Sequence, residues 1–274
     1  METAVLMLIG GVGVGIFGSL LGLGGGLLIV PLLTLGFQLP LREAIGVSLV
    51  CVIVTSGASA GVFLERRVAN LRLGMTLELF TAIGALLGGL VAFLLDERVL
   101  AGLFAALLTY VAVSMIRPRP ASAGADPVIS GDTPPDEPRT FLDTLSGPGY
   151  RVRRLRAGVV GSVGAGIASA LLGIGGGLIK VPVLHVVMGV PLRVATATSN
   201  LVIGITASTS AWIYLIRGGI DPYATGPTAV GVFVGASIGS RIAHRVDVRA
   251  LRVLFTVVLL YTAFQMVRRA AGVQ

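Results

Sequence analysis

Long apolar stretches separated by short polar segments cover almost the whole chain. There are ten such stretches, at residues 4–21, 27–37, 44–64, 73–95, 99–116, 157–172, 178–190, 194–216, 224–243 and 250–267. Eight of them are long enough to cross a bilayer, because a transmembrane helix needs about 20 predominantly apolar residues. The pattern therefore predicts an all-α polytopic membrane protein.

Two of the stretches, 27–37 and 178–190, are too short to span a membrane as straight helices. Each follows a cluster of glycines and contains a proline, Pro31 or Pro182. Glycine and proline are tolerated inside membrane helices where protein or a wet cavity can satisfy the freed backbone groups. We therefore expect each short stretch to form a half-helix or a re-entrant segment.

The second half of the sequence repeats the first at an offset of 151 residues. Residues 15–117 align with residues 166–268 without a gap, and 36 of the 103 pairs are identical. The identical pairs include Gly22 with Gly173, Pro31 with Pro182 and Arg42 with Arg193. Shared apolar composition would produce only scattered matches of Leu and Val, so a block of matched Gly, Pro and Arg indicates an internal duplication.

This duplication defines three parts of the chain. We expect a first transmembrane repeat over 1–117 and a second over 151–274, each with four full transmembrane helices and one short half-helix. Residues 118–150 between them are rich in Pro, Gly, Ser, Ala and Asp. Such a segment cannot bury enough apolar surface to fold alone. It is predicted to be a flexible linker.

The arginines bear on whether the two repeats are parallel or inverted. If the short segments cross the membrane, the repeats are inverted, and 15 arginines lie on the side of the linker against five on the other side. If they turn back, the repeats are parallel, and the counts are 13 and seven. Because cytoplasmic loops carry an excess of Lys and Arg, the counts favour inverted repeats related by a pseudo-two-fold axis. Both arrangements place the linker in the cytoplasm.

Composition supports the membrane class and removes one alternative. Hydrophobic residues make up 54% of the chain and charged residues only 12%, whereas soluble domains have about 25% charged residues. The mean hydropathy is +0.93. A net charge of +8 would suggest nucleic acid in a soluble protein, but here the arginines lie between apolar stretches and no polar module accompanies them. We therefore expect no nucleic-acid partner.

The first candidate site lies at the two glycine triplets, Gly24, Gly25 and Gly26 in the first half and Gly175, Gly176 and Gly177 in the second. Glycines let the backbone leave the helix, and the half-helix that follows presents unpaired N–H groups and the positive end of its dipole. Together these groups can bind an anion without a charged side chain. The alternative is close helix packing by small residues, although three consecutive glycines exceed what a packing seam needs.

Polar residues just beyond the half-helices form the second candidate. Ser48, Ser199 and Asn200 could donate hydrogen bonds to a bound oxyanion. Hydroxyls in a helix more often bond the carbonyls of their own helix, and for the other Ser and Thr residues of these stretches this alternative is preferred.

Two charged residues lie inside apolar stretches. Lys180 is the only lysine of the chain and lies within the second short stretch, where an uncompensated ammonium would be costly. It must face water, a partner or the substrate, and a position close to the membrane surface is the alternative. Glu78 could carry a coupling proton, but we expect an interfacial position for it.

No catalytic or metal-binding pattern is present in the sequence. The chain has only two histidines, His185 and His244, which is too few for a cluster of metal ligands. It contains no nucleophile and base pair, no phosphate-loop lysine and no zinc motif. We therefore expect no enzymatic activity, no cofactor and no metal site.

Two related segments open the short stretches, Gly22-Leu-Gly-Gly-Gly-Leu-Leu-Ile-Val-Pro31 and Gly173-Ile-Gly-Gly-Gly-Leu-Ile-Lys-Val-Pro182, each followed by Pro-Leu-Arg, Ala and Ser. With this duplicated glycine triplet and its proline five residues on, the chain resembles the TauE/SafE family of sulfite exporters. The resemblance covers both repeats and leaves out only the linker. It implies a prokaryotic inner-membrane permease for sulfite, sulfoacetate or related anions. Lys180 and the long linker are not part of the shared motif.

We therefore expect a transporter that moves a small sulfur-containing anion, such as sulfite or an organosulfonate, across the inner membrane by alternating access. Its expected partners are the anionic substrate, the lipid bilayer and a coupling proton or sodium ion, and a homodimer is a further expectation. One alternative is a transporter of a metal cation or a neutral organic molecule, for which the sparse intramembrane carboxylates are a poor match. The other is a non-transporting scaffold with a glycine-packed bundle.

Overall fold

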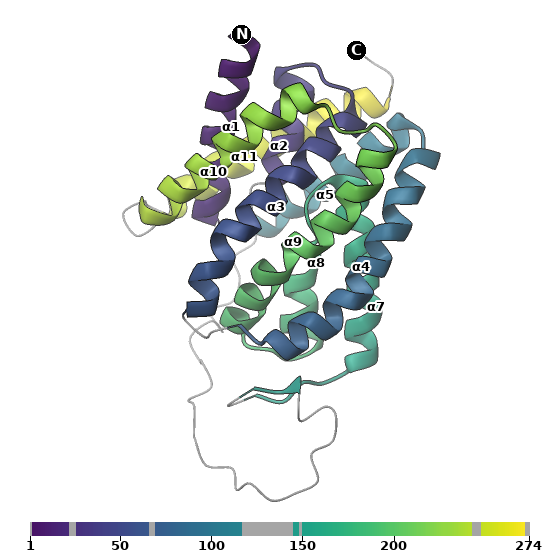
Figure 1. Ribbon diagram of the computed structural model, residues 1–274, viewed down its shortest axis with the longest axis vertical. Coiled ribbons are helices and arrows are strands. Elements are labelled where there is room, and N and C mark those ends of the chain that lie inside the picture. The colour runs from purple at the N-terminus through teal and green to yellow at the C-terminus, as the bar shows by residue number, and fades with distance from the viewer. Residues whose placement is uncertain are drawn as a thin grey trace, which may run out of the picture.

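The computed structural model describes residues 2–21, 26–65, 69–116, 145–147, 150–242 and 248–271. These residues are almost entirely helical, which confirms the predicted all-α class (Figure 1). The long helices are α1 (Glu2–Leu21), α3 (Leu41–Glu65), α4 (Leu71–Leu94), α5 (Glu97–Ile116), α7 (Leu155–Leu172), α9 (Leu192–Ile216), α10 (Pro222–Ile242) and α11 (Val248–Ala270). Most of the segment predicted as a linker lies outside the described residues.

Five helices are long and apolar enough to cross a membrane, namely α1, α3, α4, α7 and α9. The other long helices, α5, α10 and α11, have 20, 21 and 23 residues but offer no such stretch among the described residues. The eight long helices coincide with the eight long apolar stretches of the sequence.

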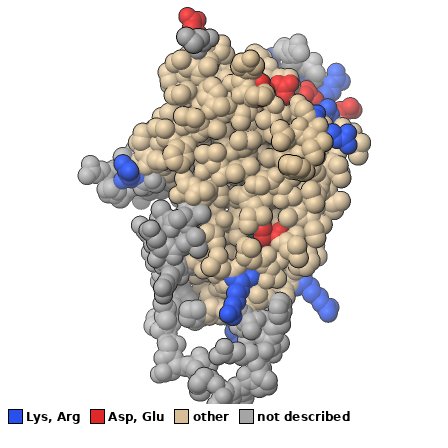
Figure 2. All heavy atoms as spheres, viewed as in Figure 1, with Lys and Arg blue, Asp and Glu red and all other residues tan. Residues whose placement is uncertain are grey.

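The outer surface of the helices is apolar. Large hydrophobic side chains such as Leu94, Trp212 and Phe264 are more than half exposed. On the face shown in Figure 2 most charged side chains lie near the upper and lower ends, with one basic group at the left edge and one acidic group in the lower half, and most of the remaining surface is uncharged. Soluble monomers rarely expose contiguous apolar surface on this scale, so lipid is the natural solvent of this face.

The two short stretches form short helices, as predicted. The first consists of α2 (Gly26–Pro31) and η1 (Leu32–Gly36), and the second of α8 (Gly177–Pro182) and η2 (Val183–Val187). In both, α-helical geometry changes to the wider π-helical geometry directly after the proline. Proline lacks an N–H group and its ring clashes with the carbonyl four residues earlier, so at this point each helix continues with π-helical instead of α-helical hydrogen bonds.

Helices of the two halves pack together in pairs. Helix α1 packs along α10, α4 along α7, α3 along α9 and α5 along α11, so each pair takes one helix from each half. Glycines allow the closest approaches, as at Gly84 and Gly166, where α4 and α7 touch through their backbones. Small residues at helix contacts are the expected device for bringing membrane helices together.

The repeated Pro-Leu-Arg motif has a structural role in the first half. Arg42, in the first turn of α3, donates a hydrogen bond to the carbonyl oxygen of Leu95, just beyond the end of α4. Its guanidinium carbon lies 5.8 Å from the centre of the Phe93 ring. A cation at the C-terminal end of a helix is favourable because that end carries partial negative charge.

The close contact between α4 and α7 at Gly166 should not tolerate a larger side chain. A Cβ atom added at Gly166 would overlap the carbonyl oxygen of Thr81 and lie 2.7 Å from the amide nitrogen of Ala85. Gly166→Ala is therefore expected to reduce the free energy of unfolding by about 1–3 kcal/mol, which is the usual cost of overpacking. Thermal unfolding of the purified protein in detergent measures this loss.

Gly164 provides the matched control on the same helix. A Cβ atom at Gly164 would have no neighbour within 4 Å, so Gly164→Ala should leave the melting temperature unchanged or raise it slightly, because alanine favours the helix by about 0.5–1 kcal/mol. Equal losses in the two variants would show that the backbone contact does not hold α4 and α7 together.

Candidate functional site

The glycine break of the second half lies between α7 and α8. Gly173, Gly175 and Gly176 have φ angles of +68°, +73° and +80°, a region that side-chain-bearing residues rarely adopt. The amides of Ile179 and Lys180 both donate to the carbonyl oxygen of Gly176, at 3.2 and 3.0 Å. The first N–H groups of a helix have no acceptor within the helix. Gly177 and Leu178 precede Ile179, the first residue whose amide makes a helical hydrogen bond, so their N–H groups remain available to a ligand.

Two serine hydroxyls flank these amides. The side chains of Ser169 on α7 and Ser199 on α9 are completely buried, and among the described residues neither oxygen has a hydrogen-bond partner. A Cβ atom added at Gly176 would lie 3.7 Å from Oγ of Ser169, and one added at Gly177 would lie 3.5 Å from Oγ of Ser199. An unpaired buried hydroxyl costs free energy, so two of them beside one helix N-terminus suggest a ligand.

We call these groups the cradle: the amides of Gly177 and Leu178 with the hydroxyls of Ser169 and Ser199. The short helix behind it runs without interruption through α8 and η2, from Gly177 to Val187. Its dipole therefore places partial positive charge at the amides. Sequence reasoning found Gly175, Gly176, Gly177 and Ser199 but missed Ser169, which lies among small residues of α7 that look like a packing seam.

The glycine break of the first half adjoins the second. Gly24 and Gly25 lie outside the described residues, but Gly26 begins α2, and a Cβ atom at Gly26 would lie 3.0 Å from the carbonyl oxygen of Gly173. The hydroxyl of Ser48 donates to the carbonyl oxygens of both residues, at 3.1 Å for Gly26 and 2.7 Å for Gly173. Ser48 thus connects the two glycine breaks. Its hydroxyl proton is already used in hydrogen bonds to backbone carbonyls.

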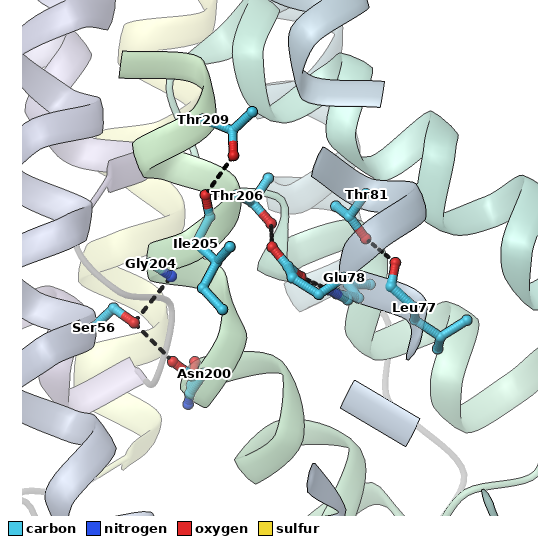
Figure 3. A network of polar contacts seen from close by, with 10 residues as sticks. Ser56, Leu77, Glu78, Thr81, Asn200, Gly204, Ile205, Thr206 and Thr209 are labelled. Carbon is cyan, nitrogen blue, oxygen red and sulfur yellow. Dashed lines mark hydrogen bonds and ion pairs between the residues drawn. The ribbon is translucent and has the colours of Figure 1, made fainter. Parts of the chain in front are cut away.

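Asn200, the remaining polar candidate, takes part in a contact between α3 and α9. The hydroxyl of Ser56 donates to the backbone carbonyl of Asn200 and accepts from the amide of Gly204, both at 3.0 Å (Figure 3). These two backbone groups are four residues apart, the spacing of a normal helical hydrogen bond. The hydroxyl therefore joins α3 to the backbone of α9, while the side chain of Asn200 is only half-buried.

Lys180 and Glu78 form an ion pair inside the helix bundle. Nζ of Lys180 on α8 contacts Oε2 of Glu78 on α4, and the hydroxyl of Thr206 on α9 donates to the other carboxylate oxygen (Figure 3). Lys180 is 1% exposed and Glu78 is 3% exposed. Both side chains therefore lie within the bundle, and neither charge is exposed on its surface. Each charge is buried because the other compensates it.

The end of the segment predicted as a linker is attached to the bundle. Asn70 caps the N-terminus of α4 and donates through Nδ2 to the hydroxyl of Tyr150, at 2.7 Å. Burial raises the pKa of the Tyr150 phenol, while this hydrogen bond lowers it. The backbone amide of Asn70 also donates to Oγ1 of Thr198, at 2.9 Å, so this contact connects α4, α9 and the chain before α7.

Other kinds of site find little support. Among the described residues no three His, Cys, Asp or Glu side chains gather as a metal site would require. A hollow of about 350 Å³ lies between α5 and α7, lined by Leu103, Leu107, Gly164, Ile167, Ala168, Leu171 and Leu172. Its lining offers no polar side chain to an anion, so the cradle remains the candidate site.

Comparison with models of protein families identifies the family of this chain. The model of the sulfite exporter TauE/SafE family matches residues 7–266. The chain belongs to this family. Members of this family are membrane transporters, so the chain is a multi-pass membrane transporter and not an enzyme, as the sequence predicted.

Two curated relatives agree with the family. The chain is 26% identical over 273 residues to the probable membrane transporter protein YunE of Bacillus subtilis, covering 96% of this chain and 97% of YunE. It is 27% identical over 271 residues to the probable membrane transporter protein MJ0441 of Methanocaldococcus jannaschii, covering 93% and 91%. No solved structure matches the chain.

The two equivalent serines should respond differently to truncation. Ser48→Ala leaves the buried carbonyls of Gly26 and Gly173 without this donor, so it is expected to cost about 1–3 kcal/mol of unfolding free energy. Ser199→Ala removes a hydroxyl that has no partner, and it should leave stability unchanged or slightly raised. Thermal unfolding in detergent without added anion compares them, and a larger loss for Ser199→Ala would contradict the assignment.

Proposed function

We propose that this transporter moves a small sulfur-containing anion, such as sulfite, an organosulfonate or a similar oxyanion, across the inner membrane by alternating access. The observation that carries the proposal is the cradle, in which two amides of a helix N-terminus and two unpartnered buried hydroxyls lie together. All four groups can donate a hydrogen bond, and an oxyanion offers several acceptor oxygens at once.

The charges around the cradle favour an anion over a metal cation. The positive end of the helix dipole points at the site, which repels cations. Glu78 is already paired with Lys180 and Thr206, so its carboxylate is not open to a metal ion. A neutral solute would make no use of the dipole. The glycine break is therefore better suited to an anion than to the alternatives.

The packing of α3 against α9 supports inverted repeats. At the start of α3, a Cβ atom added at Gly46 would overlap the carbonyl oxygen of Gly219, just beyond the end of α9. Farther along α3, Ser56 bonds to Asn200 and Gly204 in the first half of α9. The two helices are equivalent at the 151-residue offset, and they run antiparallel. A two-fold axis in the membrane plane relates equivalent helices in this way.

This orientation agrees with the topology proposed from the arginines. Repeats over 1–117 and 151–274 would face opposite sides of the membrane, and the linker over 118–150 would lie in the cytoplasm. Transporters built from inverted repeats bind their substrates near the midplane between the repeats, where the two glycine breaks adjoin. A proton or sodium gradient would drive the transport, and a homodimer would be its assembly.

Binding of sulfite to the purified protein tests the proposal. Ser169→Ala and Ser199→Ala are each expected to weaken sulfite binding about tenfold or more, because a hydrogen bond to a charged group contributes about 1.5–3 kcal/mol. Sulfite, a sulfonate and thiosulfate should each be titrated while the melting temperature is recorded, since a ligand that binds only the folded state raises it. Uptake of labelled sulfite into proteoliposomes then shows transport.

Ser208→Ala is the matched control on α9. Ser208 is exposed and its hydroxyl bonds to the carbonyl of Gly204 on its own helix, at 2.8 Å, so this variant should bind and transport sulfite like the wild type. Stabilisation by metal cations or neutral solutes alone would favour a different transporter. Absence of stabilisation by any solute, together with absence of transport, would favour a scaffold.

A further inference from the structure

The ion pair joins the two halves, and it occurs at only one of the two places that the duplication makes equivalent. At the 151-residue offset, Lys180 corresponds to Ile29 and Glu78 corresponds to Ala229. Thr206 corresponds to Thr55, whose hydroxyl bonds to carbonyls of its own helix, those of Cys51 and Val52. The side chain of Ile29 is completely buried. The positions equivalent to Lys180 and Glu78 are therefore both occupied by apolar residues.

This difference means that the fold does not require the ion pair. Replacing a buried ion pair by apolar residues is often neutral or stabilising, because removal of two charges from water costs more than their attraction returns. Ionisable residues inside a membrane protein more often mark the path of a substrate or a proton. The pair formed by Glu78 and Lys180 therefore calls for a functional explanation.

Lys180 lies next to the cradle. It follows Gly177 by three residues, which is a rise of about 4.5 Å along a helix. Side chains of a helix lean toward its N-terminus, and the cradle is at the N-terminus of α8. On α9, Ser199 and Thr206 are seven residues apart and share one face. The ammonium group of Lys180 can therefore reach an anion in the cradle by rotation of its flexible side chain.

We propose that Lys180 changes partner during transport, from the carboxylate of Glu78 to the bound anion, and that Glu78 then takes up one proton. This inference rests on the proposed function. Before binding, the site holds an ammonium and a carboxylate. After binding, it holds the ammonium, a singly charged anion and a protonated carboxyl group, so one O–H bond has formed with a proton from water.

The exchange keeps the buried site neutral in both states. One anion and one proton enter together, so neither state leaves an uncompensated charge inside the membrane, which would be costly. Transport of a singly charged oxyanion would then be coupled to one proton and would move no net charge. The hydroxyl of Thr206 can hydrogen-bond either form of Glu78, because a hydroxyl both donates and accepts.

The elements around this pair carry few other ionisable residues. The elements around it are α4, α7, α8 with η2, and α9, and their other ionisable residues are Arg72, Arg156, His185, Arg193 and Tyr214. Nδ1 of His185 bonds with the carbonyl of Val190, and the hydroxyl of Tyr214 donates to the carbonyl of Ala170. The three arginines are in the first turns of α4, α7 and α9. Glu78 is therefore the candidate to receive the proton.

Proteoliposomes with the full-length protein and labelled sulfite at a pH where its singly charged form predominates provide the test. Two modes are compared: net uptake driven by an inward proton gradient with the membrane potential clamped, and exchange of labelled for unlabelled sulfite without a gradient. In Glu78→Gln the empty site keeps an unpaired ammonium, so net uptake should fall at least tenfold and lose its response to the gradient. Exchange should fall much less, because the transporter with bound anion can still switch between its inward-open and outward-open states.

Lys180→Met should reduce both modes at least tenfold, because it removes the partner of the anion. The double variant Glu78→Ala with Lys180→Ile reproduces the apolar residues of the equivalent positions, Ala229 and Ile29, so it should insert and melt like the wild type and still lose proton-driven uptake. Ser208→Ala serves as the unaffected control in both modes.

The alternative is that the pair only holds α8 against α4. In that case the single variants would lower the melting temperature, and the double variant would restore both stability and proton-driven uptake. That result, or a wild-type response to the gradient in Glu78→Gln, would overturn the inference. Wild-type protein that exchanges sulfite but whose net uptake does not respond to the proton gradient would overturn this inference alone. Lack of sulfite binding and of exchange in the wild type would overturn the proposed function as well.

Discussion

The structure depends on one constraint, that backbone polar groups inside a membrane must find partners within the protein. A continuous helix satisfies them by itself, but the two glycine breaks do not. The hydroxyl of Ser48 meets part of this demand by donating to the carbonyls of Gly26 and Gly173, one from each half. The amides at the start of α8 remain, and the buried hydroxyls of Ser169 and Ser199 face the same region. The hydrogen bonds of Ser48 thus join the two halves at the glycine breaks, while the amides at the start of α8 and the hydroxyls of Ser169 and Ser199 remain as free donors among the described residues.

The duplication produced two copies of the glycine break with its short helix and nearby serine, and the two copies have diverged. Ser48 binds two carbonyls, while the equivalent Ser199 has no partner among the described residues. Ile29 is replaced by Lys180 in the second half, which pairs with Glu78. Glycines and prolines that shape the backbone were retained in both copies. Ser169, Ser199 and Lys180 surround the second glycine break, so one substrate site is expected and not two.

Packing also determines which parts could move as rigid bodies. Helices α1 with α10 and α4 with α7 touch along their glycines, backbone against backbone, and such close contacts do not adjust gradually. Each of these pairs combines helices from both halves. Alternating access, as proposed, would therefore move mixed pairs relative to the central helices α3 and α9. The contact of Ser56 with Asn200 and Gly204 lies between these two central helices.

The sequence alone determined the helical class, the duplication, the two short helices and the family resemblance, because these follow from apolar length, repeated Gly and Pro, and local backbone chemistry. Only the tertiary structure decided what the polar residues contact. Glu78 and Lys180 are 102 residues apart in the chain, and each by itself looks like a residue at the membrane surface. Ser48 and Ser199 match in the alignment, yet one is engaged and the other is not, because their neighbours come from different helices. Hydrogen bonds and ion pairs act over a few ångströms, so the partners are defined only once distant segments have packed.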